Sequence, residues 1–186
     1  MTTAAASPLR LYLGELRQLF DSLDPAPFRE RDLDAQAAEY IVASAREAPS
    51  GATLALQVQL GREPASAAAS ALLRDAVREY FERRAEGRRR ELRQLFRTGR
   101  LSLVIGMAFL AGAIALAQWL GSLINHEGYA WLVSESLIIG GWVALWRPME
   151  IFLYDWWPIR ADAKLFDRLA AMPVSLIDAP RGGQRA

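Results

Sequence analysis

The chain has 186 residues, with 22 Lys and Arg against 21 Asp and Glu, one His and no Cys. The net charge of +1 gives no global attraction to nucleic acid, and the lack of Cys excludes disulfide frameworks, zinc–thiolate sites and thiol nucleophiles. A mean hydropathy of +0.06 beside 23% charged residues indicates that apolar and charged residues are segregated along the chain, as in a membrane protein.

The first part of the chain predicts a small α/β unit. Residues 9–23 are ambiguous, because the first leucines alternate as in a strand whereas the later ones have helical spacing. A helix is predicted over residues 33–48, with Asp32 as its N-cap, and the alternating TLALQVQL over 53–60 predicts a strand. The expected order is βαβα or αβα, with at most two strands.

A two-stranded sheet is marginal in water by itself, and its edges expose unpaired backbone groups. We therefore expect a homo-oligomer in which a neighbouring subunit completes or covers the sheet. After the strand, Ser66 is expected to cap a long amphipathic helix, whose Arg-rich end leads into an apolar run.

Two apolar runs predict a transmembrane hairpin. Residues 101–124 carry no formal charge, and as a helix they would reach roughly 36 Å, enough to cross a hydrocarbon core of about 30 Å. The polar NHEG at 125–128 predicts a turn. The second run covers 129–146, and Pro148 is expected to end its helix.

The C-terminal part is predicted to lie on the membrane and then to be disordered. Residues 149–159 are aromatic, carry two carboxylates and are too short to span, so we interpret 148–172 as an interfacial or cytoplasmic amphipathic helix against the inner leaflet. The alternative is a cytoplasmic extension of the second span that packs on the soluble unit. Residues 173–186 are predicted to be a disordered tail. The fold class is thus α+β, with a cytoplasmic domain over 1–98 and the hairpin over 99–147.

The positive-inside rule orients this hairpin. Basic residues precede the first run and follow the second, at the end of the hairpin opposite its loop, and the loop has none. Both termini are therefore expected in the cytoplasm. The N-terminus also lacks a signal-peptide pattern. Lipid headgroups are expected at Arg88, Arg89, Arg90, Arg93, Arg97 and Arg100. Interface anchors are expected at Trp119, Tyr129 and Trp131 on the outer side and at Trp142, Trp146, Trp156 and Trp157 on the inner side.

Two stretches, SLDPAPFRERDLD (22–34) and ESLIIGGWVALWRPMEIFLYDWWPIR (135–160), carry a family resemblance. They resemble an uncharacterised bacterial family of two-span inner-membrane proteins, and the resemblance covers most of the chain outside the tails. It implies two spans and a bacterial inner-membrane location. It implies no activity, ligand or site residue.

Glu135 is the sharpest single candidate for function. It lies about six residues inside the second run, where an ionised carboxylate costs up to ~3 kcal/mol. Gln118 lies at a similar depth, so a protonated Glu135 could hydrogen-bond to it, with Ser134 or Ser136 assisting. The functional interpretation is an ion or proton site in a pore between subunits. The alternative, which we favour, is an interhelical clamp.

Other candidates have simpler explanations. Small residues, above all Gly112, Gly140 and Gly141, predict close helix packing. Glu150 and Asp155 would form an acidic ring if many subunits assembled, although pairing with Arg147, Arg160 or the soluble unit is the simpler interpretation. The loop residue His126 is expected to be solvated; the alternative is a metal-binding or pH-sensing ring of His126 side chains in a symmetric oligomer.

The sequence contains no P-loop, dinucleotide-binding, zincin or nucleophile-elbow motif. We therefore expect no enzyme, no cofactor and no metal site. The leading prediction is a self-assembling scaffold or docking platform of the bacterial inner membrane, in contact with membrane lipids and without a nucleic-acid partner. The alternatives are an oligomeric ion or proton pore that uses Glu135 and an accessory subunit of a larger membrane complex.

Overall fold

The computed structural model describes residues 7–20, 32–49, 51–62, 66–123 and 127–178. It is mostly helical, with a small three-stranded parallel sheet and two long helices that are apolar enough to cross a membrane. By its internal contacts the chain divides into two compact units. The first is Met1–Gly87 together with Asp162–Ala186, and the second is Arg88–Ala161.

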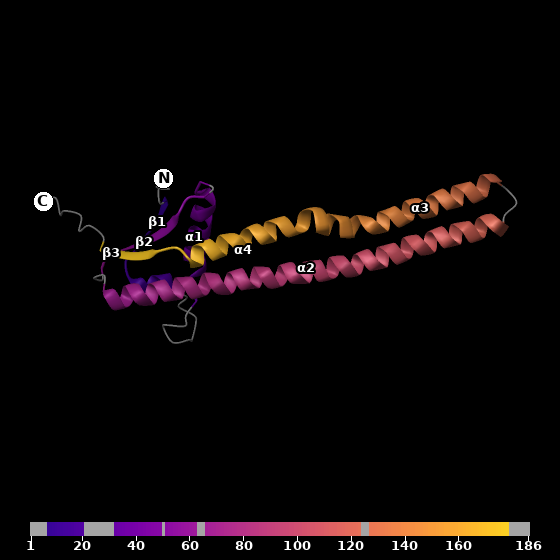
Figure 1. The fold of residues 1–186 in the computed structure, drawn as a ribbon. Coiled ribbons are helices and arrows are strands. Elements are labelled where there is room, and N and C mark those ends of the chain that lie inside the picture. Colours follow the sequence, from indigo (N-terminus) through magenta and orange to yellow (C-terminus); the bar gives the residue numbers. More distant parts are fainter. Residues whose placement is uncertain (1–6, 21–31, 50, 63–65, 124–126, 179–186) are drawn as a thin grey trace. The chain divides into compact units, whose positions relative to one another are not determined.

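The sheet of the first unit contains β1 (Ser7–Leu13), β2 (Leu54–Leu60) and β3 (Val174–Asp178), all parallel and in the order β1-β2-β3 (Figure 1). Both crossovers therefore step in the same direction across the sheet. Because parallel crossovers are almost always right-handed, both place their helices on the same face. The burial of β2 agrees, since its side chains alternate between buried and half-buried.

A single hydrophobic core fills the covered face of the sheet. It is closed by α1 (Ala35–Glu47), by the first turns of α2 (Ala67–Leu123) and by the part of α4 (Trp156–Ala170) that belongs to this unit. Phe81 is fully buried and stacks on Phe166 with ring centroids 6.2 Å apart. Fully buried aliphatic partners are Ile41, Leu56, Val58, Leu73, Val77 and Leu169.

The third strand corrects two predictions. The expectation of at most two strands is wrong, and the predicted disordered tail over 173–186 is wrong for Val174–Asp178, which form β3. β3 pairs with β2 from Leu56↔Val174 to Leu60↔Asp178. The chain thus supplies its own third strand, so an incomplete sheet is no longer a reason to expect self-association. Self-association itself stays a prediction.

The ambiguous segment 9–23 contains both kinds of element. The alternating leucines belong to β1, and the helix-like spacing that follows belongs to a short 3-10 helix, η1 (Leu16–Leu19). The side chain of Gln18 accepts a hydrogen bond from the Gly14 N–H at 2.9 Å and so closes the turn between them. Residues 21–23 lie outside the described residues.

The helix predicted over 33–48 and the strand predicted over 53–60 are confirmed as α1 and β2. The N-cap of α1 differs from the prediction. The Asp34 carboxylate accepts hydrogen bonds from the N–H groups of Gln36 at 3.0 Å and Ala37 at 3.1 Å, whereas Asp32 pairs with Arg83.

Asp34→Ala should lower the free energy of unfolding of the first unit by about 1 kcal/mol, because it leaves two N–H groups of the first helical turn without acceptors. Asp32→Ala removes an exposed ion pair with Arg83 and should cost less than about 0.5 kcal/mol. Urea unfolding of the full chain in mild detergent, followed by circular dichroism, measures both. Equal losses for the two variants would contradict this assignment of the cap.

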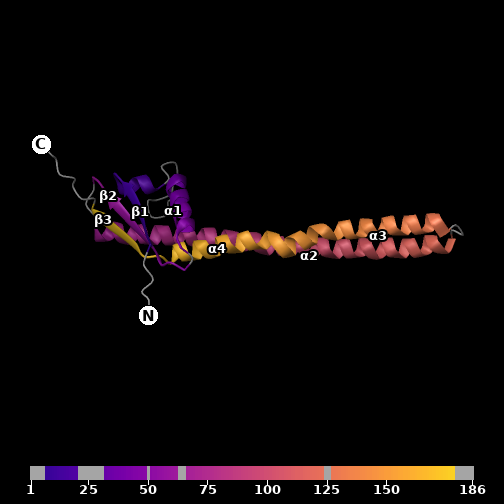
Figure 2. The ribbon, with the colours of Figure 1, turned by 90° about the horizontal axis from the view of Figure 1, so that it is seen from above.

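The second unit contains α2 from Arg88 onward, α3 (Glu127–Glu150), η2 (Ile151–Asp155) and the start of α4. The prediction that a helix capped by Ser66 continues into the first apolar run is confirmed, since the Ser66 hydroxyl accepts the Ala69 N–H at 3.1 Å and α2 is continuous to Leu123. Within this unit α3 runs back along α2 in both views (Figures 1 and 2).

The predicted helix end at Pro148 is wrong. Pro148 lies inside α3 and is fully buried, and the chain remains helical through a π-helical turn, η2, into α4. A proline frees the carbonyl four residues earlier, here that of Ala144, and disturbs the helix rather than ending it. Residues 149–159 consequently continue the second apolar helix instead of forming a separate helix on the leaflet, and Phe152 contacts α2 at Phe96, with ring centroids 6.1 Å apart.

Candidate functional site

A seam of small residues joins the two helices of the second unit. Gly99, Gly106 and Ala113 recur every seven residues on α2, and all three are buried. A Cβ added to Gly106 would lie 2.9 Å from Leu145 Cδ2 and 3.1 Å from the Ala144 carbonyl oxygen. The small size of the residues at this seam therefore allows the two backbones to approach closely, and a repeat of seven residues is typical of helices that pack at a small crossing angle.

Of the three predicted packing glycines, Gly112 of α2 and Gly140 and Gly141 of α3, one lies at this seam. A Cβ on Gly141 would meet the side chain of Leu110 and lie 3.3 Å from its Cα, whereas a Cβ on Gly112 or Gly140 would have no atom within 4 Å. Gly106 was not predicted. The spacing of seven between small residues was the available signal, but several small residues compete in this run, and only the register with α3 distinguishes them.

The remaining faces of the hairpin are apolar and exposed. In the two candidate spans only 17% of the most apolar window is buried within the chain, whereas a core helix of a soluble protein would be mostly buried. Contiguous exposed apolar surface of this extent marks an interaction with a membrane or a protein. The side chains include Leu101, Val104, Ile105, Met107, Phe109, Leu132, Ile139, Trp142, Val143 and Trp146.

The predicted polar site is not assembled among the described side chains of the chain, to which that of Ser134 does not belong. Glu135 and Gln118 are both exposed, and no hydrogen bond joins them among the interactions of the described residues. The Ser136 hydroxyl donates to the Leu132 carbonyl of its own helix at 2.8 Å. The pairing of α2 with α3 at the seam, extended toward the loop, places Glu135 at the level of about residue 116 of α2. That level is roughly 3 Å along the helix axis from Gln118.

The carboxylates near the inner end of α3 are paired. Arg147 donates to Glu150 at 3.1 Å and lies 3.6 Å from Asp155, while the Trp146 indole N–H also donates to Glu150 at 3.1 Å. This is the simpler of the two interpretations considered for Glu150 and Asp155, and both carboxylates already have a local counter-charge.

Aromatic side chains lie at the same end of the hairpin. Trp156 contacts Phe96 with ring centroids 6.4 Å apart, and Arg160 lies over the Trp156 ring at 5.5 Å. All three residues line an open depression of about 370 Å³. Trp157 is exposed, as an interfacial anchor requires. Trp119, Trp142 and Trp146 are also exposed. His126 and the side chains of Tyr129 and Trp131 lie outside the described part.

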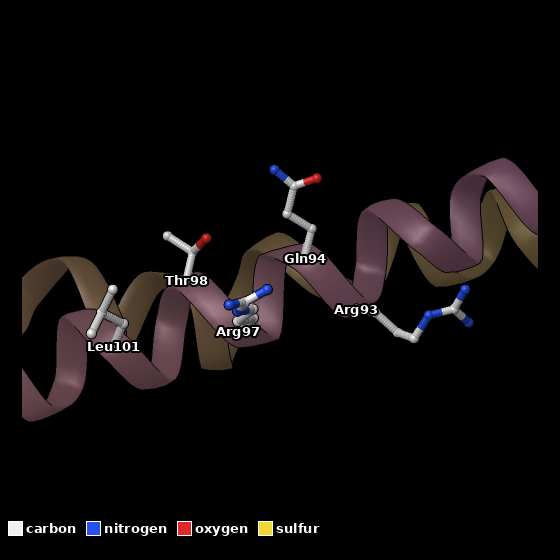
Figure 3. Close-up of a pocket in the computed structure, with 5 residues that line it drawn as sticks. All are labelled: Arg93, Gln94, Arg97, Thr98 and Leu101. Atoms are coloured by element: carbon white, nitrogen blue, oxygen red, sulfur yellow. The ribbon is translucent and has the colours of Figure 1, made fainter.

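The arginines before the first apolar run fall into two groups. Arg88 pairs with Glu91 at 2.7 Å, and Arg89 and Arg90 also have interactions within the chain. Further along α2, an open depression of about 500 Å³ is lined by Arg93, Gln94, Arg97, Thr98 and Leu101, whose side chains project from one side of the helix (Figure 3).

Among the described residues, no group of three or more His, Cys, Asp or Glu side chains is arranged to hold a metal ion. Comparison with known protein families, with curated proteins and with solved structures gives no match.

Proposed function

We propose that the chain is a two-span protein of the bacterial inner membrane, in which the hairpin anchors a non-enzymatic α/β unit on the cytoplasmic side. The observation that carries this proposal is the exposed apolar surface of α2 and α3 around a packed small-residue seam. Such a surface is costly in water and favourable in lipid. The basic residues at one end of the hairpin support the cytoplasmic orientation.

The α/β unit is proposed to act as a self-assembling scaffold or docking platform. Parallel sheets are normally covered on both faces, but in the described part of the chain the helices cover one face. The open face presents Arg10, Tyr12, Gln57 and Gln59, and Tyr12 is 66% exposed. Arg10 is the only charged residue among the outward-facing positions of the three strands, so a second copy can meet this face with little like-charge repulsion.

Native mass spectrometry of the full chain in lipid nanodiscs tests this function, and we expect a defined oligomer. Adding charge to the open face by Gln57→Arg with Gln59→Arg should weaken the assembly at least tenfold, because like charges across an interface cost several kcal/mol. Gln36→Arg, on the exposed surface of α1, is the matched control and should leave it unchanged. A wild-type monomer would contradict self-assembly but not the membrane hairpin.

A pore is the second candidate, favoured by one observation. Glu135 is an exposed ionisable side chain of a membrane-spanning helix without a described partner in its own chain, and such groups normally face another subunit or water. A pore predicts cation or proton flux in proteoliposomes that Glu135→Gln abolishes. A scaffold predicts that proteoliposomes stay impermeable to ions with the wild type and with Glu135→Gln.

A further inference from the structure

Three arginines at the entrance to the first span lack a partner among the residues that the structure describes. Arg93, Arg97 and Arg100 have no hydrogen bond or ion pair with another residue in the described ranges, in contrast to the arginines one and two turns earlier. Two carboxylates of this unit are paired with other arginines, Glu91 with Arg88 and Glu150 with Arg147. The three positive charges are therefore uncompensated by the part of the chain that the structure describes.

These arginines lie on one face of α2. Positions i, i+4 and i+7 face the same side of a helix, and the rise from Arg93 to Arg100 is about 10 Å. Gln94 and Thr98 line the adjoining depression and add neutral hydrogen-bond donors (Figure 3). Guanidinium groups with amide and hydroxyl donors form a set suited to the oxygens of a phosphate.

The face changes from charged to apolar at Leu101. This residue lines the same depression and is 62% exposed, and Val104, one turn further, is 64% exposed. A free phosphate would use only the polar half of this surface. A phospholipid uses both halves, since its phosphate contacts the arginines while its acyl chain lies along the apolar side chains.

We propose that Arg93, Arg97 and Arg100, with Gln94 and Thr98, bind the phosphate of an anionic phospholipid at the cytoplasmic leaflet. This inference rests on the proposed membrane hairpin and extends it from general headgroup contact to a discrete lipid site. Bound lipid would fix the depth at which α2 enters the membrane.

Lipid retention by the full chain tests the site. The protein in mild detergent is titrated with phosphatidylglycerol or with phosphatidylcholine, and bound lipid is counted by native mass spectrometry. Wild type should retain phosphatidylglycerol preferentially. Arg93→Gln with Arg97→Gln should weaken retention roughly 30-fold, at about 1 kcal/mol for each arginine near an anionic headgroup. Arg89→Gln with Arg90→Gln removes the same charge from internally engaged residues and should change retention less than about threefold.

Three results would overturn the lipid site. Equal losses in the two double variants would show a diffuse charge effect, and equal retention of both lipids by wild type would show no anion preference. Displacement of the lipid by millimolar inorganic phosphate would indicate a soluble anion as the ligand. Membrane fractionation of wild type distinguishes failure of the lipid site from failure of the membrane hairpin. A chain that is recovered in the membrane but shows no lipid preference contradicts the lipid site alone. A chain recovered in the soluble fraction contradicts the hairpin.

Discussion

Replacing Gly106 by Leu should destabilise the hairpin by about 1–3 kcal/mol, the usual cost of forcing extra methylenes into a packed interface. The first added carbon already meets Leu145 Cδ2 at 2.9 Å and the Ala144 carbonyl oxygen at 3.1 Å. A backbone oxygen cannot rotate away as a side chain can, so the helices must separate. Unfolding in a mild detergent titrated with dodecyl sulfate, followed by tryptophan fluorescence, measures the effect.

Gly112→Leu is the matched control for this substitution. Gly112 lies in the same helix and is exposed, with no atom within 4 Å of an added Cβ. It should be neutral or stabilise by up to about 1 kcal/mol, because glycine is a poor helix former. If Gly112→Leu destabilised the hairpin as much as Gly106→Leu, the helix seam would not lie where the structure places it.

Ending the chain at Met172 should abolish cooperative unfolding of the first unit. The truncation removes β3, with the buried Val174, and leaves β2 as an edge of a two-stranded sheet. Such a sheet is at the margin of stability in water, and small units have only about 5–15 kcal/mol to lose. Thermal unfolding and limited proteolysis of the truncated and full-length proteins measure the loss.

Two substitutions in the full-length chain test β3 separately from the truncation. Val174→Asp places a carboxylate in the core without shortening the chain and should destabilise the unit by several kcal/mol. Ile177→Thr keeps a β-branched residue at a 41% exposed position of the same strand and should cost less than about 1 kcal/mol. A truncated chain that still unfolded cooperatively at the wild-type temperature would show that β3 is dispensable.

Sequence periodicity predicted the elements whose patterns are long and uninterrupted. The α1 and β2 segments and the continuous passage of α2 into the first apolar run agree with the structure to within a few residues. Each of these has a cap, a regular alternation or an apolar run far longer than a turn, so local sequence was sufficient.

The elements that were missed depend on distant partners. β3 is a short VSLID segment between Pro173 and a Gly-containing end, and it is a strand because β2 offers a free edge 118 residues earlier in the register Leu56↔Val174. Pro148 is tolerated within α3 because neighbouring α2 packs closely there, at Gly99 and Gly106. Neither the pairing of β3 with β2 nor the packing of α2 near Pro148 can be predicted from the residues adjacent in the sequence.

The same distinction applies to the candidate sites. Counting residues from the predicted turn placed Glu135 and Gln118 at similar depth, but depth does not determine which way two side chains point around their helices, and both point outward. From the sequence alone, contact with lipid headgroups was predicted equally for all six arginines before the first apolar run. The structure separates those with internal partners from Arg93, Arg97 and Arg100, which have none among the described residues.

The most direct test of the membrane hairpin is its topology, measured by labelling a single cysteine. Because the natural chain has no Cys, one introduced thiol reports one position. Cysteine is placed at His126, in the predicted outer loop, or at the exposed Ser175 of β3, and bacterial spheroplasts are treated with an impermeant maleimide. The proposed topology predicts that the position-126 variant is labelled in intact spheroplasts and the position-175 variant only after lysis. Labelling of the position-175 variant in intact spheroplasts, or recovery of the chain in the soluble fraction, would contradict it.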